Sequence, residues 1–158
     1  MLNPEEQKWQ NKITIVIPTY NTPEFLYRNL SYLDSYKLPL NIIVTDSSRK
    51  ENKKINQAIV KKAQNLKVTY LGEFNPKVSP FLKWSQTIDK VKTPFVVLCA
   101  DDDFISLEGL IKSLNFLILH KDYCAVEGKN IFFVNLNIFG LNFFTWKAGY
   151  VRDSFERE

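Results

Sequence analysis

The sequence predicts an α/β protein with a mostly parallel sheet and helices on both faces. Short runs rich in β-branched residues alternate with segments whose apolar residues recur at helical spacing, in the order β-α-β-α-β-α-β-α-β. The chain has 158 residues, 45% of them hydrophobic, which suits one domain with a buried core. We therefore expect a single domain over residues 1–158, with an atypical Phe-rich hairpin and charged tail over 129–158.

Five segments are expected to be strands. Residues 13–18 (ITIVIP) form a continuous β-branched run, typical of a strand buried on both faces. The other four are residues 41–45 (NIIVT), 67–71 (KVTYL), 94–100 (PFVVLCA) and 123–126 (YCAV). In such sheets ligands bind beyond the carboxyl ends of the strands, so the polar residues there are the functional candidates.

Four helices are expected between these strands. Thr22-Pro23 and Ser79-Pro80 each combine an N-cap residue with a first-turn proline, and Ser106 is the expected cap of the last helix. Helix by helix, the expected core-facing residues are Leu26, Leu30 and Leu33; Ile55, Ile59 and Ala63; Phe81, Trp84, Ile88 and Val91; and Leu107, Leu110, Ile111, Leu114 and Leu117. Lys83 is expected to be a solvated helix lysine. Residues 130–146, with Gly140 in their middle, predict a strand–turn–strand hairpin.

Charge and cysteine content exclude several classes of function. The net charge is +4, and its clusters at residues 49–54 and 61–62 lack the continuous basic stripe with interleaved aromatics that nucleic-acid binding requires. We interpret them as solvated helix faces. Cys99 and Cys124 lie in apolar runs and are predicted to be buried thiols. The single histidine, His120, is expected at a helix C-terminus, and no zinc spacing exists.

Targeting signals are not apparent in the sequence. Residues 1–11 are polar and do not resemble a signal peptide. No run reaches the about 18 apolar residues that a transmembrane helix needs. The sequence therefore predicts no transmembrane segment and a cytoplasmic location, with peripheral membrane association as the variant.

The most informative segment is the run of three aspartates, Asp101, Asp102 and Asp103, at the end of the fourth expected strand. Adjacent carboxylates repel by roughly 1 kcal/mol per pair in water and by about 4 kcal/mol at a half-buried site, so something must offset the repulsion. Helix capping requires one acid, and Ser106 is better placed for it. A calcium loop of the EF-hand type fails, because its sixth position requires glycine and holds Ser106 here.

Two chemical interpretations of the aspartates stay open. An aspartyl-phosphate enzyme places its nucleophile just after a buried strand with a second acid two residues on, as Asp101 and Asp103 are placed, but usually on the first strand of the domain. The other interpretation is Mg²⁺ or Mn²⁺ held by carboxylates against a diphosphate. The cation cancels the carboxylate repulsion and neutralises charge on a departing diphosphate. This second interpretation uses adjacent acids more naturally.

Three segments, in this order, resemble the family 2 glycosyltransferases of GT-A fold, which use nucleotide-diphosphate sugars. Residues 13–21 (ITIVIPTYN) resemble the opening strand and loop, 42–48 (IIVTDSS) the second strand and its Asp-containing turn, and 93–104 (TPFVVLCADDDF) the strand leading to the DxD metal motif. The resemblance covers about residues 13–128. It implies a Rossmann-like GT-A fold, a UDP- or GDP-sugar donor, Mg²⁺ or Mn²⁺, and a hydroxyl acceptor such as a glycan or a lipid-linked sugar.

The resemblance also implies which residues bind the nucleotide sugar: Thr19, Tyr20, Asn21, Asp46, Asp101 and Asp102. The first three would line the base and ribose pocket, and Asp46 would accept a hydrogen bond from the base. Asp101 or Asp102 would face the ribose or the sugar, and Asp102 or Asp103 would hold the metal. Structural alternatives stay open, because Tyr20 is also suited to packing, and Asn21 and Asp46 to turns in which they bond their own backbone.

The resemblance leaves the acceptor half of such an enzyme unaccounted for. Family members are usually much longer, and their second half supplies a catalytic carboxylate and, in some, a QxxRW motif. No such motif occurs here, and no catalytic residue is assigned. We expect a fragment, a chain that works with another chain, or one that has lost catalysis. A non-catalytic nucleotide-binding module and a metal-dependent phosphoryl-transfer enzyme are the alternatives. The apolar residues 131–146 predict self-association.

Overall fold

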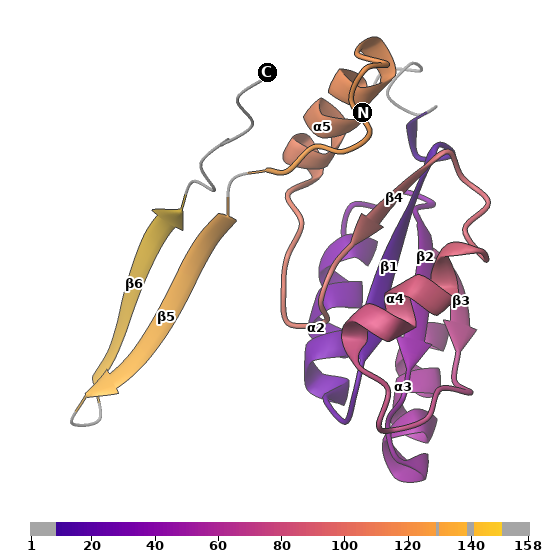
Figure 1. Ribbon diagram of the computed structural model, residues 1–158. Coiled ribbons are helices and arrows are strands. Elements are labelled where there is room, and N and C mark those ends of the chain that lie inside the picture. The colour runs from indigo at the N-terminus through magenta and orange to yellow at the C-terminus, as the bar shows by residue number, and fades with distance from the viewer. Residues whose placement is uncertain (1–8, 129, 139–140, 150–158) are drawn as a thin grey trace. The chain divides into compact units, whose positions relative to one another are not determined.

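The structure is a computed structural model that describes residues 9–128, 130–138 and 141–149 (Figure 1). The chain divides into two compact units, Met1–Leu107 and Glu108–Glu158. The sequence analysis had treated residues 1–158 as one domain with an atypical segment from residue 129. The first unit contains the sheet and every candidate site residue, so it is the unit that matters for function.

The first unit is a four-stranded parallel sheet in the order β3-β2-β1-β4. Its strands are β1 (Ile13–Thr19), β2 (Asn41–Asp46), β3 (Lys67–Leu71) and β4 (Phe95–Leu98), and its helices are α2 (Pro23–Asp34), α3 (Lys50–Lys62) and α4 (Pro80–Ile88). In Figure 1, α4 crosses one face of the sheet, and α2 and α3 lie on the other. The predicted fold class is therefore confirmed.

The core lies where the sequence analysis placed it along β1 and α2. All seven residues of β1 are buried, as expected for an inner strand flanked by β2 and β4. On α2, Leu26, Leu30 and Leu33 are at most 2% exposed. The helix begins at Pro23 as predicted, but the hydroxyl of Thr22 makes no capping bond. On α4, by contrast, Ser79 Oγ accepts the predicted capping bond from the Leu82 amide at 3.2 Å.

The predicted buried faces of α3 and α4 are only partly right, since Ile59, Ala63, Trp84 and Val91 are half-buried and the other three residues are exposed. On α3, Ile55 is 48% exposed and Asn56 is fully buried. On α4, Phe81 is 77% exposed and Ile88 44%, whereas Lys83 and Thr87 are buried. The inward side chains are polar because they bond to the sheet edge or to the helix itself, as the site below shows. The apolar residues left outside include Phe81, whose ring packs edge-on against Trp84 at 5.5 Å between centroids.

The second unit contains α5 (Leu107–Leu119, whose first residue lies at the division), β5 (Asn130–Ile138) and β6 (Leu141–Gly149). The two strands pair antiparallel, which confirms the predicted hairpin; Gly140, its predicted turn residue, lies outside the described residues. The predicted strand at 123–126 is wrong: these residues are irregular and exposed, Cys124 included. His120 follows α5 as expected, and its ring stacks on Phe116 at 4.4 Å. The predicted self-association rests on side chains of residues 131–146, which lie largely outside the description.

No helix among the described residues combines the length and the apolar character needed to cross a membrane.

Candidate functional site

Three loops meet at the carboxyl edge of the sheet. They follow β1, β2 and β4, and contain residues 20–22, 47–49 and 99–105. Thr19 and Asp46 are paired in register at the ends of β1 and β2, and the Ser47 amide donates to the Thr19 carbonyl at 3.2 Å. The Thr22 hydroxyl donates to Asp101 Oδ2 at 2.7 Å, which ties the first loop to the acidic one. The residues singled out in the sequence are thus brought to one edge.

Asp46 is fully buried, and the protein itself engages both of its carboxylate oxygens. Oδ1 accepts from the Ser48 amide at 2.6 Å, and Oδ2 accepts from Asn56 Nδ2 at 2.7 Å and from the Tyr70 hydroxyl at 2.5 Å. The bond to Ser48 is the local contact expected if Asp46 forms a turn with the backbone that follows it. Burial and the Asp46 carboxylate raise the pKa of Tyr70 far above its usual value, so its hydroxyl stays a donor. The base-contacting role of Asp46 stays a prediction.

Asn21 connects the first loop to the start of α3. Its φ of 58° lies in the left-handed region, which asparagine tolerates better than most residues. Its amide donates to Ser48 Oγ at 2.8 Å, and its Oδ1 accepts from the Arg49 amide at 2.9 Å and from Asn52 Nδ2 at 3.2 Å. Asn21 therefore fixes the loop, and beside it Tyr20 is 45% exposed. Thr19 is buried, and within the described structure its hydroxyl has no hydrogen-bond partner.

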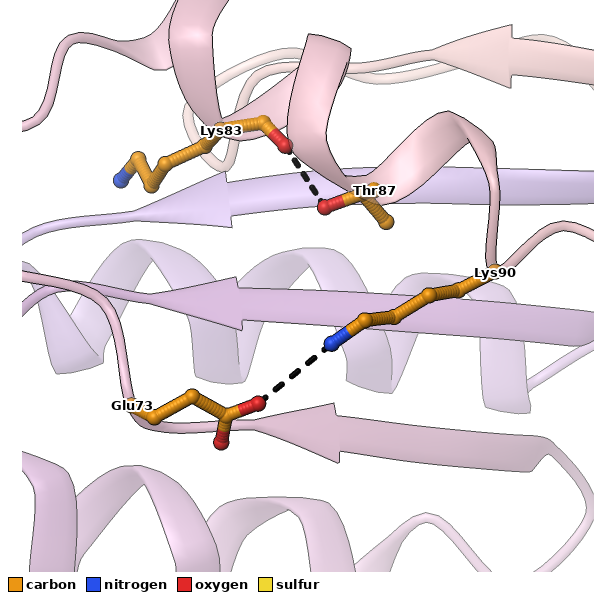
Figure 2. A network of polar contacts seen from close by, with 4 residues as sticks. All are labelled: Glu73, Lys83, Thr87 and Lys90. Atoms are coloured by element: carbon orange, nitrogen blue, oxygen red, sulfur yellow. Dashed lines mark hydrogen bonds and ion pairs between the residues drawn. The ribbon is translucent and has the colours of Figure 1, made fainter.

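Lys83 is the site residue that the sequence analysis wrongly expected in solvent. It is 1% exposed, not solvated, because its amine donates to the Thr19 carbonyl at 2.8 Å and to Ser47 Oγ at 3.0 Å. In Figure 2 its side chain runs along the strands toward their carboxyl ends. Burial lowers the pKa of Lys83, and the charges of Asp46 and Asp101 oppose that shift. No local sequence signal distinguishes this lysine from its solvated neighbours.

Helix α2 holds the acidic loop by its backbone. Asn29, which is 2% exposed, donates through Nδ2 to the carbonyls of Ala100 at 3.3 Å and Asp103 at 2.8 Å. Arg28 Nη2 donates to the Asp102 carbonyl at 3.0 Å. These bonds leave the carboxylates of Asp102 and Asp103 free, and within the described part of the chain no side-chain hydrogen bond to either is found. Both residues are exposed.

The electrostatics of the loop favour a cation beside these carboxylates. Partial burial, then the charges of Asp102 and Asp101, raise the pKa of Asp103 above its usual value. The described residues contain no group of three or more His, Cys, Asp or Glu able to hold a metal alone. Mg²⁺, however, binds through one or two carboxylates and takes its other ligands from phosphates and water. The adjacent oxygen donors of Asp102 and Asp103 therefore fit Mg²⁺ or Mn²⁺ in kind.

The two cysteines are expected to differ sharply in thiol reactivity. Cys99, which opens the acidic loop, is 3% exposed, and burial raises its pKa to about 11, whereas Cys124 is exposed. Because the thiolate is the reactive form, iodoacetamide at neutral pH is expected to label Cys124 at least about tenfold faster than Cys99. Mass spectrometry of digested samples taken over time measures both rates. Equal rates in the folded protein would contradict the buried position of Cys99, and labelling in denaturant is the control.

The fold is that of the GT-A-type glycosyltransferases. The solved structures that resemble it include the mannosyltransferase PcManGT from Pyrobaculum calidifontis in complex with GDP-Man and Mn²⁺, with a TM-score of 0.57 and 17% identity over 70% of this chain and 33% of that chain. They also include S. aureus TarS 1-349, with a TM-score of 0.53 and 23% identity over 76% of this chain and 34% of that one, and its complex with UDP-GlcNAc, at 22% identity.

These likenesses establish a shared fold at low sequence identity. The chain spans about a third of the length of the structures it matches. No protein-family model matches the sequence, and no curated protein does.

Proposed function

We propose that this chain binds a nucleotide-diphosphate sugar, UDP- or GDP-linked, as the donor part of a glycosyltransferase. Such an enzyme transfers the sugar to a hydroxyl acceptor, such as a glycan or a lipid-linked sugar, with the help of Mg²⁺ or Mn²⁺. The observation that carries the proposal is the acidic loop. Its backbone is fixed by α2, while the carboxylates of Asp102 and Asp103 are left exposed and unbonded by described side chains, at the edge where parallel sheets bind ligands.

Each candidate residue receives a role in this proposal. Asp102 and Asp103 hold the metal, which when bound neutralises charge on the nucleotide diphosphate. Tyr20, exposed beside β1, offers its ring to the base. Asp101, fixed by Thr22, faces the ribose or sugar. The pocket is shaped by Thr19, Asn21 and Asp46, whose positions inside the protein favour a structural role. Lys83 joins the ends of β1 and β2.

A second candidate is a nucleotide-sugar-binding module without catalysis. The contacts described above give the site residues binding and structural roles, and a catalytic base is assigned to none of them. In either case we propose a cytoplasmic setting, with which the free thiols Cys99 and Cys124 agree. Release of free sugar or transfer to an acceptor distinguishes a catalyst from a binder.

Calorimetric titration of UDP and GDP tests the proposal. With Mn²⁺ present, one of the two nucleotides is expected to bind, and removing the metal is expected to weaken binding at least about tenfold. The Asp102→Asn/Asp103→Asn variant is expected to lose the metal-dependent part of the binding. Asp89→Asn, an exposed carboxylate at the end of α4, is the matched control and is expected to bind as the wild type does. Absence of binding of either nucleotide with every metal would refute the proposal.

A further inference from the structure

The positive charge of the chain is concentrated on and around α3. Residues 49–67 carry seven lysines and arginines against one glutamate, although the whole chain has a net charge of only +4. The remainder of the chain is therefore net negative. Among the described contacts, no basic side chain of this segment bonds to the acidic loop or to a candidate site residue; Lys53 donates to the Phe74 carbonyl.

Three exposed lysines of α3, Lys50, Lys54 and Lys61, form one row, which we call the lysine row. At 3.6 residues per turn, positions four and eleven residues apart fall within about 40° of one another around the helix. The row is about 16 Å long at 1.5 Å per residue. Asn56, the buried residue of α3, points to the opposite side of the helix, so the lysine row faces solvent.

Nothing in the described structure neutralises the lysine row. The ion pairs of the described residues are Lys90 with Glu73 and Lys112 with Glu108, and neither involves α3. Glu51 lies three residues before Lys54, about 60° away around the helix, and no ion pair between the two is found among the described contacts. Like charges four residues apart on a helix destabilise it, so the spacing of Lys50 and Lys54 is unfavourable for the isolated fold. An anionic partner would remove that cost.

Exposed apolar side chains lie on the side of α3 that faces α2, about 100° or more around the helix from the lysine row. Ile55 is 48% exposed on α3, and Tyr27 is 54% exposed on α2. Tyr27 and Lys62 line the same shallow pocket between the two helices. A cluster of lysines on one exposed helix face is the pattern of a segment that an anionic membrane surface attracts electrostatically.

We propose that the outer face of α3 docks on an anionic lipid surface. The lysine row meets the phosphate and carboxylate groups of the lipids. Lysines near an anionic leaflet are attracted without a specific geometry, which suits a row of flexible ammonium groups. Nucleic-acid recognition fits less well, because the row contains no arginine and no interleaved aromatic residue. The proposal does not depend on the donor site, because the bonds from this segment to Asn21 and Asp46 come from the Arg49 amide, Asn52 and Asn56 and not from the lysine row.

Vesicle sedimentation with the full chain tests the proposal. Vesicles contain phosphatidylcholine alone or with about 30% phosphatidylserine, at about 0.1 M and about 0.5 M salt. The wild type is expected to sediment with the anionic vesicles at low salt, and at least about tenfold less with neutral vesicles or at high salt. The variant Lys50→Gln/Lys54→Gln/Lys61→Gln is expected to lose at least about tenfold in partitioning. Lys12→Gln/Lys77→Gln/Lys92→Gln removes the same charge from exposed positions elsewhere and is expected to keep most of the binding.

Several outcomes would overturn the proposal. Equal losses in the two triple variants would show that net charge alone drives binding. Equal binding to neutral vesicles would exclude the lysine row as the cause. Binding to a short DNA duplex that is lost in the Lys50→Gln/Lys54→Gln/Lys61→Gln variant would point to nucleic acid as the partner in place of lipid. Added inorganic phosphate at millimolar concentration is expected to leave sedimentation unchanged, whereas release by phosphate would point to a free-anion site. Both variants are expected to have the melting temperature of the wild type, which confirms that each is folded.

Discussion

Replacing Lys83 with methionine is expected to lower the free energy of unfolding by about 2–4 kcal/mol. Methionine keeps a flexible, largely apolar stem in the same buried space but donates no hydrogen bond. The Thr19 carbonyl and Ser47 Oγ would each lose a donor at the point where the ends of β1 and β2 are joined. Asp46 and Asp101 would lose a nearby positive charge. Urea denaturation at neutral pH measures the change.

The matched control for this variant lies on the same side of the sheet (Figure 2). Lys90→Met removes an exposed lysine whose ion pair with Glu73 spans 3.4 Å. Exposed pairs of this kind contribute about 0–1 kcal/mol, so the midpoint should hardly move. If Lys83→Met and Lys90→Met unfold at the same urea concentration, the buried position of Lys83 is wrong. Stability measured between neutral pH and about pH 10 gives a second test.

The sign of that pH dependence follows from the lowered pKa of Lys83. Between the pKa in the folded state and the ordinary lysine value of 10.5, the unfolded chain binds more protons than the folded one. The contribution of Lys83 to stability therefore rises with pH across that window. The stability difference between the wild type and Lys83→Met should widen toward alkaline pH, and a difference that narrows would contradict the burial of the amine.

Replacing Asp46 with alanine is expected to cost about 3–5 kcal/mol of stability. Three donors, from the Ser48 amide, Asn56 and Tyr70, point at its carboxylate, and all three would lose their acceptor in a buried environment. Leaving a buried donor unpaired costs its full desolvation, which makes the loss larger than that of an average hydrogen bond. Chemical denaturation measures the loss of stability. Substitution of Asn56 gives a second measurement, because its Nδ2 donates to the same Asp46 oxygen as the Tyr70 hydroxyl.

The control is Asp34→Ala, a less buried carboxylate that accepts from the Asn65 amide at 2.8 Å and from its side chain at 3.0 Å. Its loss is expected to cost about 1 kcal/mol. The Asp46 variant also separates two roles of that residue. If Asp46→Ala retains wild-type stability but loses nucleotide binding, its carboxylate is a ligand contact and not an internal brace. A folded but less stable variant that still binds the nucleotide would support the bracing role.

The sequence predicted the elements of the sheet better than the faces of its helices. The continuous apolar run at the start of the chain identified β1, because a strand buried on both faces needs no alternation. On α2, the leucines recur at helical spacing, and this periodicity identified the buried side of the helix. On α3 and α4 the periodicity misled, because Asn56 and Lys83 turn inward to satisfy polar groups of other strands and loops. The partner Asp46 lies 10 residues from Asn56, and Ser47 lies 36 residues from Lys83, and helical periodicity contains no information about either.

The features of the candidate site also differ in how well the sequence predicts them. The position of the acidic run at the end of β4 was predictable, since an apolar run followed by charges marks a strand end. That β4 lies at the edge of the described sheet and is only partly buried was not foreseen. The hydrogen bonds from Asn29 and Arg28 to the backbone of that loop were not predictable, because they join residues more than seventy positions apart. The internal roles of Asn21 and Asp46 were foreseen only as turn-forming alternatives, and their further bonds depend on α3 and β3.

Amide chemical shifts measured by NMR test the central claim most directly. The full chain is titrated with the nucleotide diphosphate that binds, in the presence of Mg²⁺, and every shifted amide is mapped on the structure. The account predicts shifts clustered in residues 19–22, 46–49 and 100–104, the three loops at the carboxyl edge of the sheet. The Asp102→Asn/Asp103→Asn variant should show little change. Shifts confined to the opposite edge of the sheet or to the outer face of α3 would contradict a donor site at these loops.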